Sequence, residues 1–421
     1  MANRPENMDP RQRRREEQRK RRKKQQRRLR LGLAAAVIVL GLACGAIFYF
    51  VQGTPESADV SLQSLPVATT APATEPTEQT RSRWDNVTTV HIRAAGDLNI
   101  TDSVVDSGLA GNGYDYTRAF QDVASTLSSA DLTLMNLEGN ICGEPYGTAT
   151  TSAPNKLLTA LRGAGVDILQ VANSCTINNG LIGLNSTLQS IRTAGMEPVG
   201  AYASSSEFKK SKGYTICEVQ GIRIAVVAFT KGVGGRGMPD GSEDCVNLLY
   251  TDYESTYRKV NTDGITRVLK NAKAENPDFI IAMVHWGSEN NDTISKTQQS
   301  IITLLQKNGV GLILGTHPHL VQQVEYDQSA GTLVAYSLGD FYGDGTRKGT
   351  NYSIILDVEV TKDADLKTTK VTGYSYIPIF TTKEAEGDGY RRVVRTEEAM
   401  YAYENNYVDK VTADCYTAMK K

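Results

Sequence analysis

The chain has 421 residues, of which 40% are hydrophobic, so it can bury a core and hold more than one domain, which excludes a wholly disordered chain. Its formal net charge is -1 at pH 7, yet residues 1–30 contain fourteen Lys or Arg and only four Asp or Glu. A basic segment of this kind binds either nucleic acid or anionic lipid, and the segment that follows decides between the two.

That following segment, residues 31–51, contains no charged side chain. About 21 residues at about 1.5 Å each are enough to cross a hydrocarbon core of about 30 Å. We therefore predict a single membrane anchor at 31–51, with the basic tail 1–30 in the cytoplasm and the rest outside the cell, so membrane rather than nucleic acid is the expected partner. A cleaved signal peptide is the alternative, although its apolar region is usually only about 7 to 15 residues long.

Three further regions follow the predicted anchor. Residues 52–87 are rich in Thr, Pro, Ser and Ala, which is typical of a disordered, extended stalk. Residues 88–380 are predicted to form the folded domain. Residues 381–421 are predicted to form a helical extension, with a polar helix at 396–419.

Within the folded domain a short apolar strand, a polar residue near its end and a helix recur, which favours an α/β fold with a largely parallel sheet. Predicted strands lie at 88–95, 131–135, 166–172, 222–229, 279–284, 311–316 and 332–341. Predicted helices lie at 116–128, 154–161, 184–193, 265–274 and 297–307. Residues 230–244 are predicted to be a Gly-rich loop that acts as a lid or a surface excursion.

Five side chains suited to metal binding stand near the ends of these apolar runs. They are Asp97, Glu138, His285, His317 and His319. Because ligands of open α/β sheets lie at the carboxyl ends of strands, we expect one shared site, and Pro318 stiffens the backbone between the last two histidines. Imidazoles with carboxylates, one of which can bridge, suit one or two divalent ions. The alternative is that each is a capping or solvated loop residue, and His91, inside the first strand, is predicted to be structural.

An ordered set of motifs around these residues resembles the CapA family, named for poly-gamma-glutamate capsule synthesis. The motifs are Gly96-Asp97-Leu98-Asn99, Asn136-Leu137-Glu138, Ala172-Asn173, His285-Trp286-Gly287-Ser288-Glu289, Gly315-Thr316-His317-Pro318-His319 and Tyr336-Ser337-Leu338-Gly339. The resemblance implies a calcineurin-like metallophosphoesterase fold, an α/β two-sheet β-sandwich flanked by helices. It also implies a membrane-anchored extracellular protein that serves an anionic polymer, beside membrane-embedded capsule synthesis or export proteins.

Carried over by position, the resemblance makes the five side chains metal ligands, with Glu138 as the bridge and Mn, Zn or Fe as the expected ions. Secondary candidates are Asn99, Asn136, Asn173, Ser174, Glu289 and Asp340.

The chain departs from the family pattern at four positions. Members usually read Ala-Asn-Asn-His-x-x-Asp at residues 172–178. This chain has Ser174 in place of an amide ligand, Cys175 in place of the general-acid histidine and Asn178 in place of a carboxylate. In a later motif, Asp340 stands where Asn is usual. Losing a positioned general acid costs a factor of about 10² to 10⁴ in rate. We therefore expect an accessory protein for synthesis, export or anchoring of the polymer, with degraded catalysis and no assigned catalytic residue. The alternative is an active hydrolase of phosphoester or peptide-like bonds.

Five of the six cysteines follow the predicted anchor, where an oxidising compartment can pair them. Bridges between Cys142 and Cys175 and between Cys217 and Cys245, with Cys415 left over, are one interpretation. The other is that these are small buried side chains without bonds.

Overall fold

A computed structural model describes residues 86–383, 390–396, 413–415 and 417. The predicted basic tail, the predicted anchor and nearly all of the predicted stalk lie outside these residues, as does most of the predicted C-terminal helix. Within the described part of the chain, no helix has the length and apolar character needed to cross a membrane.

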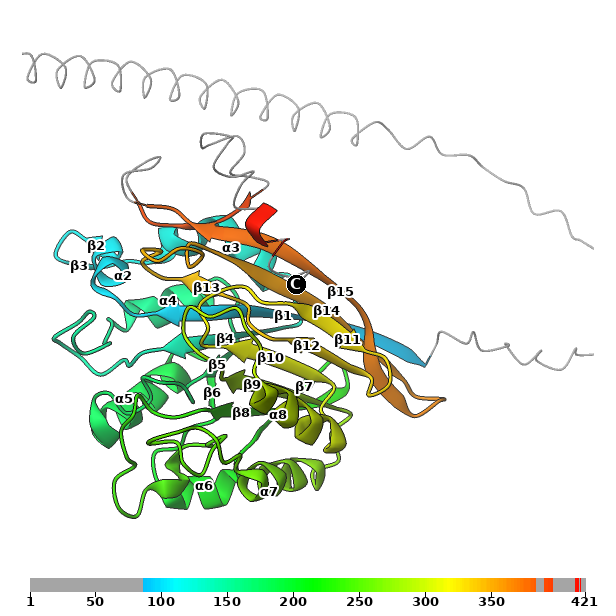
Figure 1. The fold of residues 1–421 in the computed structure, drawn as a ribbon. Coiled ribbons are helices and arrows are strands. Elements are labelled where there is room, and N and C mark those ends of the chain that lie inside the picture. The colour runs from blue at the N-terminus through cyan, green and yellow to red at the C-terminus, as the bar shows by residue number, and fades with distance from the viewer. Residues whose placement is uncertain (1–85, 384–389, 397–412, 416, 418–421) are drawn as a thin grey trace, which may run out of the picture. The chain divides into compact units, whose positions relative to one another are not determined.

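Two large sheets form the centre of the folded unit (Figure 1). The first has the spatial order β16 (Val393–Arg395), β15 (Thr368–Thr381), β14 (Tyr352–Asp363), β1 (Val87–Asn99), β4 (Leu132–Glu138), β5 (Ile168–Gln170) and β6 (Glu197–Val199), with β13 (Asp340–Tyr342) paired to β1. The second has the order β11 (Val324–Asp327), β12 (Thr332–Ala335), β10 (Leu312–Thr316), β9 (Phe279–His285), β8 (Ile222–Thr230) and β7 (Thr215–Val219). A separate hairpin pairs β2 (Leu109–Ala110) with β3 (Gly113–Tyr114).

Each sheet combines a parallel centre with antiparallel margins. β1, β4, β5 and β6 run parallel to one another, while β14, β15 and β16 continue the first sheet antiparallel. In the second sheet β8, β9, β10 and β12 are parallel, and β7 and β11 are antiparallel at the two edges.

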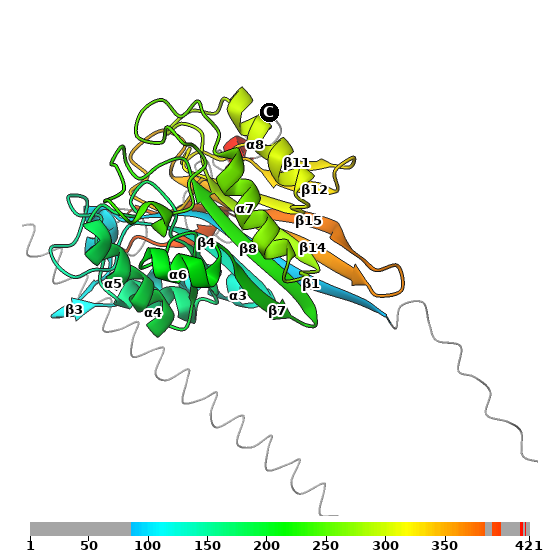
Figure 2. The ribbon, with the colours of Figure 1, turned by 90° about the horizontal axis from the view of Figure 1, so that it is seen from below.

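Helices cover the outer faces of both sheets. They are α2 (Asp102–Ser107), α3 (Thr117–Ser128), α4 (Lys156–Gly163) and α5 (Gly180–Thr193) beside the first sheet, and α6 (Ser205–Ser211), α7 (Thr262–Lys273) and α8 (Lys296–Lys307) beside the second, with a 3₁₀ turn at Glu243–Cys245. Figure 2 shows α7 and α8 along the second sheet. The inward stripe of α7 is spaced as a helix requires, with Ile265, Val268, Leu269 and Ala272 all buried.

The core lies in three layers. The central layer is formed between the two sheets by side chains such as Ile92 and Leu134 of the first sheet and Ile281 and Leu314 of the second, each at most 1% exposed. Full burial of a side chain of this size contributes about 1.5 to 3 kcal/mol. Two further layers join each sheet to its helices. The two sheets are thus packed face to face across the central layer.

The predicted α/β class is confirmed, and the predicted helices agree with the observed ones to within a few residues. Two expectations need correction. The recurring unit favoured one largely parallel sheet, whereas the structure has two sheets with antiparallel margins, as the two-sheet sandwich implied by the resemblance requires. Two long strands, β14 and β15, were not predicted. Asp97 lies inside β1 rather than past its end, because β1 continues through Gly96 to Asn99.

Gly96 explains this extension of β1. A Cβ atom there would stand 1.8 Å from the carbonyl oxygen of Gly339, so only glycine allows the two chains to approach this closely. The amide of Asp97 then donates to the same Gly339 oxygen over 2.9 Å.

Candidate metal centre

The five predicted metal ligands come from neighbouring ends of the two sheets. Asp97 lies in β1 and Glu138 ends β4, both in the first sheet. His285 ends β9 of the second sheet, and His317 and His319 follow β10. The structure therefore brings all five side chains together, but at the junction of two sheets rather than along one edge.

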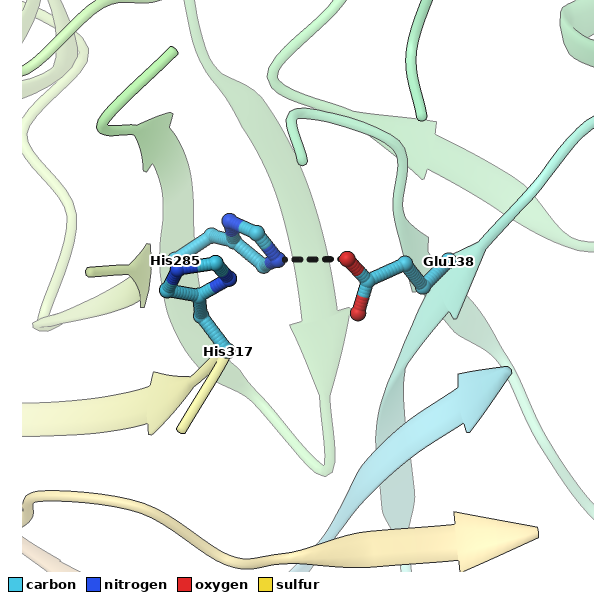
Figure 3. Close-up of side chains that lie close together, drawn as sticks. All are labelled: Glu138, His285 and His317. Atoms are coloured by element: carbon cyan, nitrogen blue, oxygen red, sulfur yellow. Dashed lines mark hydrogen bonds and ion pairs between the residues drawn. The ribbon is translucent and has the colours of Figure 1, made fainter. Parts of the chain in front are cut away.

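Glu138, His285 and His317 form a first triad, and Figure 3 shows the carboxylate facing the two rings. One possible ligand atom from each side chain lies within 4.8 Å of the other two. His285 Nε2 is 3.1 Å from Glu138 Oε1, and the two imidazole centroids are 4.5 Å apart. The other ring nitrogen of His285, Nδ1, lies 3.4 Å from the hydroxyl oxygen of Thr230, which fixes the ring with Nε2 toward the triad.

Asp97, Glu138 and His319 form a second triad with the same spread of ligand atoms. Glu138 belongs to both triads, which is the arrangement expected of a bridging carboxylate. A third combination joins Glu289, which is exposed, to His317 and His319.

Asp97 is held by a chain of amides. Its Oδ2 accepts the His317 backbone N–H over 3.0 Å, and its Oδ1 accepts from Asn136 Nδ2 over 2.6 Å. Asn173 Nδ2 in turn donates to Asn136 Oδ1 over 3.1 Å and to the Leu137 carbonyl over 2.7 Å. Asn136 and Asn173, predicted as secondary ligands, thus act in this structure as positioning residues.

His319 has a different set of neighbours. Its Nδ1 lies 2.8 Å from Asp340 Oδ1, 3.6 Å from Asp97 Oδ2 and 3.3 Å from Asn99 Nδ2. Burial opposes protonation of the ring, but the hydrogen bond and charge of Asp340 outweigh burial and raise the pKa of His319 to about 11. Burial raises the pKa of Asp340 to about 7.

Other pKa shifts in the cluster follow burial and neighbouring charge. Burial and then the charge of Glu138 raise the pKa of Asp97. Burial would also raise the pKa of Glu138, but the charge and hydrogen bond of His285 hold it below the usual value. Burial and the neighbouring His285 hold the pKa of His317 well below its ordinary value, so this ring is neutral, as a metal ligand must be.

The backbone of the His317 and His319 loop is strained. Both residues have positive φ angles, 93° and 60°, which are uncommon for side chains other than glycine. Conformations of this kind cost about 1 to 3 kcal/mol each and concentrate at functional sites. The strain turns both rings toward the carboxylates of the first sheet.

Two polar atoms show that the cluster fits a cation. Within the described residues, Glu138 Oε2 and His317 Nδ1 are buried and have no hydrogen-bond partner. Asp97, Glu138 and Asp340 are only 0%, 6% and 7% exposed, and burying carboxylates this close together is costly unless positive charge compensates them. The mixture of imidazole and carboxylate donors suits divalent Zn, Mn or Fe.

The segment 174–178 contributes little chemistry to this cluster. Cys175 lines a cavity of about 350 Å³ that also contains Glu138, Glu289 and His319. Burial and then the charge of Glu138 raise the pKa of the Cys175 thiol, so it is neutral and a poor substitute for an acidic histidine. Asn178 donates to Thr151 and accepts from Arg236 over 2.6 Å. Cys175 belongs to none of the triads found among the described residues.

All five cysteines in the described part of the chain are free. The bridges from Cys142 to Cys175 and from Cys217 to Cys245, one of the two interpretations, are therefore not formed. The other interpretation, cysteines without bonds, is confirmed, although Cys142, Cys175 and Cys217 are only partly buried. The Cys142 sulfur instead lies 3.4 Å from Ser152 Oγ, and Cys217 lies 3.8 Å from the Ile224 carbonyl.

Several cavity residues were not predicted from the sequence. The cavity beside the triads is lined by Arg347 and by the hydroxyl side chains Thr101, Thr148, Thr151, Thr346 and Thr350. Thr230, which fixes His285, directly follows a predicted strand, and its position there is the signal that would have identified it. The threonines of the cavity carry no such signal, because they come from separate loops.

The sequence is similar to proteins of one bacterial family. Residues 91–345 match the sequence profile of the family described as bacterial capsule synthesis protein PGA_cap. The "Capsule biosynthesis protein CapA" of Bacillus anthracis is 26% identical over 244 residues, 55% of each chain. The "PGA biosynthesis protein CapA" of Bacillus subtilis (strain 168) is 27% identical over 203 residues, 48% of this chain and 49% of that one. The chain thus spans about half the length of these relatives.

Two solved structures with weaker likeness are phosphoesterases by description. A "novel phosphatase" of Mycoplasma pneumoniae is 13% identical with a TM-score of 0.44, covering 70% of this chain and 94% of that one. A "calcineurin-like phosphoesterase" of Bacillus subtilis is 16% identical with a TM-score of 0.42, covering 79% and 97%. The profile match covers more than half of the chain, and on that ground the chain belongs to the bacterial capsule synthesis protein PGA_cap family.

Proposed function

We propose that this protein binds divalent metal at the junction of its two sheets and serves in the synthesis, export or anchoring of an anionic envelope polymer similar to poly-gamma-glutamate. The observation that carries the proposal is the pair of triads that share Glu138 in a chain of this family. Bound divalent ions supply Lewis acidity toward carbonyl or phosphoryl oxygens.

The chain's own residues suit an anionic ligand beside the metal. Arg347 lines the cavity next to the triads, and its guanidinium provides a planar, permanently charged donor for a carboxylate or phosphate. The Thr148 hydroxyl of the same wall accepts from the Asp102 amide and keeps its own proton for a ligand oxygen, whereas Thr151, Thr346 and Thr350 donate within the protein. Glu138 and His319 of the second triad line the same cavity, so it combines part of the metal centre with a wall that can bind an anion.

We infer that catalysis is weakened in this chain. The thiol of Cys175 stays neutral because burial raises its pKa, and the side chain of Asn178 is occupied by Thr151 and Arg236. The segment therefore positions no acidic group. The second candidate function, an active hydrolase of phosphoester or peptide-like bonds in the polymer, is favoured by the retained triads, which are sufficient to hold two ions.

We also propose that residues 31–51 anchor the protein in the cell membrane as a single span, with residues 1–30 in the cytoplasm and the folded domain outside. The charge asymmetry of these segments supports this. Membrane-embedded synthesis or export proteins are the expected partners. Recovery of the chain in the soluble fraction with an N-terminus near residue 53 would contradict the anchor.

The test of metal binding uses the full chain purified in detergent. We expect close to two divalent ions per chain by elemental analysis and a marked loss in His285→Ala. His91→Ala is the matched control, because His91 is outside the triads and lies 3.2 Å from Asp357 instead. Absence of bound metal from the wild-type protein after incubation with Mn²⁺ or Zn²⁺ would overturn the proposal.

Polymer binding and hydrolysis are then separated. We expect poly-gamma-glutamate to bind the metal-loaded protein and Arg347→Ala to weaken binding, with Lys348→Ala, the neighbouring exposed cation, as control. Turnover of a phosphodiester or of the polymer that is lost in His317→Ala would establish the second candidate in place of the first.

A further inference from the structure

We propose that Asp340 is an additional metal ligand of this chain and makes the two halves of the centre unlike, so that they select different ions. The half with His319 would hold a hard, oxygen-preferring ion such as Mn²⁺, and the half with His285 and His317 would hold Zn²⁺. The proposal rests on metal binding at the triads and deepens it.

The register of β1 and β13 places two carboxylates side by side. The strands are parallel, and Asp97 is the direct partner of Asp340 across the pair. Like charges at directly opposed positions of a sheet destabilise it, and here both side chains are at least nine-tenths buried. A cation between the two carboxylates would turn this destabilising repulsion into a stabilising attraction.

The distances around His319 bracket the spacing of ligands on one ion. Its Nδ1 is 2.8 Å from Asp340 Oδ1 and 3.6 Å from Asp97 Oδ2. Two donors that each bind an ion at about 2.1 Å stand about 3.0 Å apart at an octahedral angle and about 3.4 Å apart at a tetrahedral one. Asp340 thus lies beside the second triad, close enough for a small shift to bring its Oδ1 to the same ion.

The orphaned oxygen of the bridge gives an independent indication. Glu138 Oε1 faces His285, whereas Glu138 Oε2 is buried with no partner among the described residues. The carboxylate is 6% exposed and belongs to the triad with Asp97 and His319 as well as to the triad with the two other histidines. One oxygen therefore remains available to the second half of the centre.

The two halves then differ in donor chemistry. The first offers two imidazoles and one carboxylate, a set that suits Zn²⁺. The second offers Asp97, Asp340 and the shared Glu138 with only one imidazole, and Asn99 lies within 3.3 Å of that ring. Carboxylate-rich sites favour Mn²⁺ and Mg²⁺ over ions that prefer nitrogen or sulfur.

The test is competitive loading of the full chain in detergent with equal Mn²⁺ and Zn²⁺, followed by elemental analysis and by electron paramagnetic resonance of bound Mn²⁺. We expect about one ion of each kind per chain in the wild-type protein. Two Zn²⁺ per chain under competition would overturn the proposal while leaving metal binding itself intact. No bound metal of either kind would overturn the proposed function and this inference together.

Asp340→Asn tests the residue directly, because the amide keeps the shape and the hydrogen-bond acceptor for His319 but removes the charge. We expect at least tenfold weaker Mn²⁺ binding with Zn²⁺ binding unchanged. Asp344→Asn is the control, since Asp344 lines the same cavity but its Oδ1 accepts from Thr346 within its own turn. Unchanged Mn²⁺ affinity in a folded Asp340→Asn protein would show that Asp340 only orients His319. If the variant does not fold, the competition experiment on the wild-type protein tests whether the two halves select different ions.

Discussion

The two sheets contribute different chemistry to the same site. The first sheet supplies carboxylates, with Asp97 from β1, Glu138 from β4 and Asp340 from β13. The second sheet supplies imidazoles, with His285 from β9 and the histidine pair after β10. Neither sheet alone has a set of donors that both neutralises and coordinates a divalent ion. The centre is therefore a property of the packed pair of sheets.

The contacts that join the two sheets at the site connect residues far apart in the sequence. The hydrogen bond from the His317 amide to Asp97 joins residues 220 positions apart, and the contact from His285 to Glu138 spans 147 positions. Contacts this distant form only after both sheets and their helices have come together. Occupancy of the centre is accordingly a direct measure of whether the two sheets are correctly packed.

The largest expected effect is at Glu138, where the two halves meet. Glu138→Gln removes the charge shared by both triads, so we expect affinity for both ions to fall by at least about a hundredfold, which corresponds to about 2.7 kcal/mol. Asp97→Asn should weaken mainly one ion. Titration calorimetry of the full chain with Zn²⁺ and Mn²⁺ measures this.

Glu325→Gln is the matched control for Glu138, because Glu325 lies on β11 of the second sheet and accepts from the Tyr336 hydroxyl, outside the triads. Retention of one tightly bound ion in Glu138→Gln would show that the carboxylate does not bridge, and the two halves would then be independent sites.

The next effect is on stability. An ion that binds only the folded state stabilises it by about 2.7 kcal/mol at a free concentration one hundred times Kd. We therefore expect chelation with EDTA to lower the unfolding temperature of the wild-type protein by several degrees, and re-addition of metal to restore it. His285→Ala should respond much less. Equal unfolding temperatures for the loaded and chelated wild-type protein would mean that the centre does not join the sheets energetically.

A smaller effect is expected one layer behind the ligands. Asn136→Ala removes the amide that donates to Asp97 Oδ1 and accepts from Asn173, leaving buried polar atoms unsatisfied at a cost of about 1 to 3 kcal/mol. Ions bound in the Asp97 half should weaken while those in the His285 half should not. Denaturant unfolding and metal titration of Asn136→Ala, with Asn99→Ala for comparison, check this prediction.

Local sequence patterns predicted much of the fold and of the cluster, because each ligand stands near the end of its own apolar run. A strand that delivers its last residues to the sheet edge leaves that signature whichever sheet it joins. Asp97, Glu138, His285 and His317 were identifiable on this basis. The pattern does not state which strands pair, so it placed the ligands on one sheet edge, and the expectation of two sheets came from the family resemblance instead.

The missed elements share a physical cause. The hairpin of β14 and β15 joins its strands by a short turn with no helix between them, so it lacks the recurring unit of strand and helix. The role of Asp340 depends on its register against Asp97, and register across 243 positions is a tertiary property. Thr230 and Asn173 act through hydrogen bonds that only the assembled sheets create.

The last prediction concerns Cys175, which lies beside the carboxylates yet carries no acidity. Burial raises the pKa of its thiol, and the charge of Glu138 raises it further, so the folded protein keeps this proton at pH values where an ordinary cysteine, with a pKa near about 8.5, has lost it. In chelated protein we expect alkylation of Cys175 by iodoacetamide to be much slower than that of a small free thiol at pH 8, and not to level off below pH 10. The same shift affects stability. The protonated Cys175 thiol favours the folded state at pH values below the pKa of this thiol in the unfolded chain, and this contribution to the free energy of unfolding declines as the pH rises above that pKa. Mass spectrometry of the digested protein quantifies the labelled peptide, and Cys175→Ser confirms its identity. Rapid labelling that reaches a plateau near pH 7 would instead reveal a thiolate, and Cys175 would then regain its place as a candidate acid or ligand at the centre.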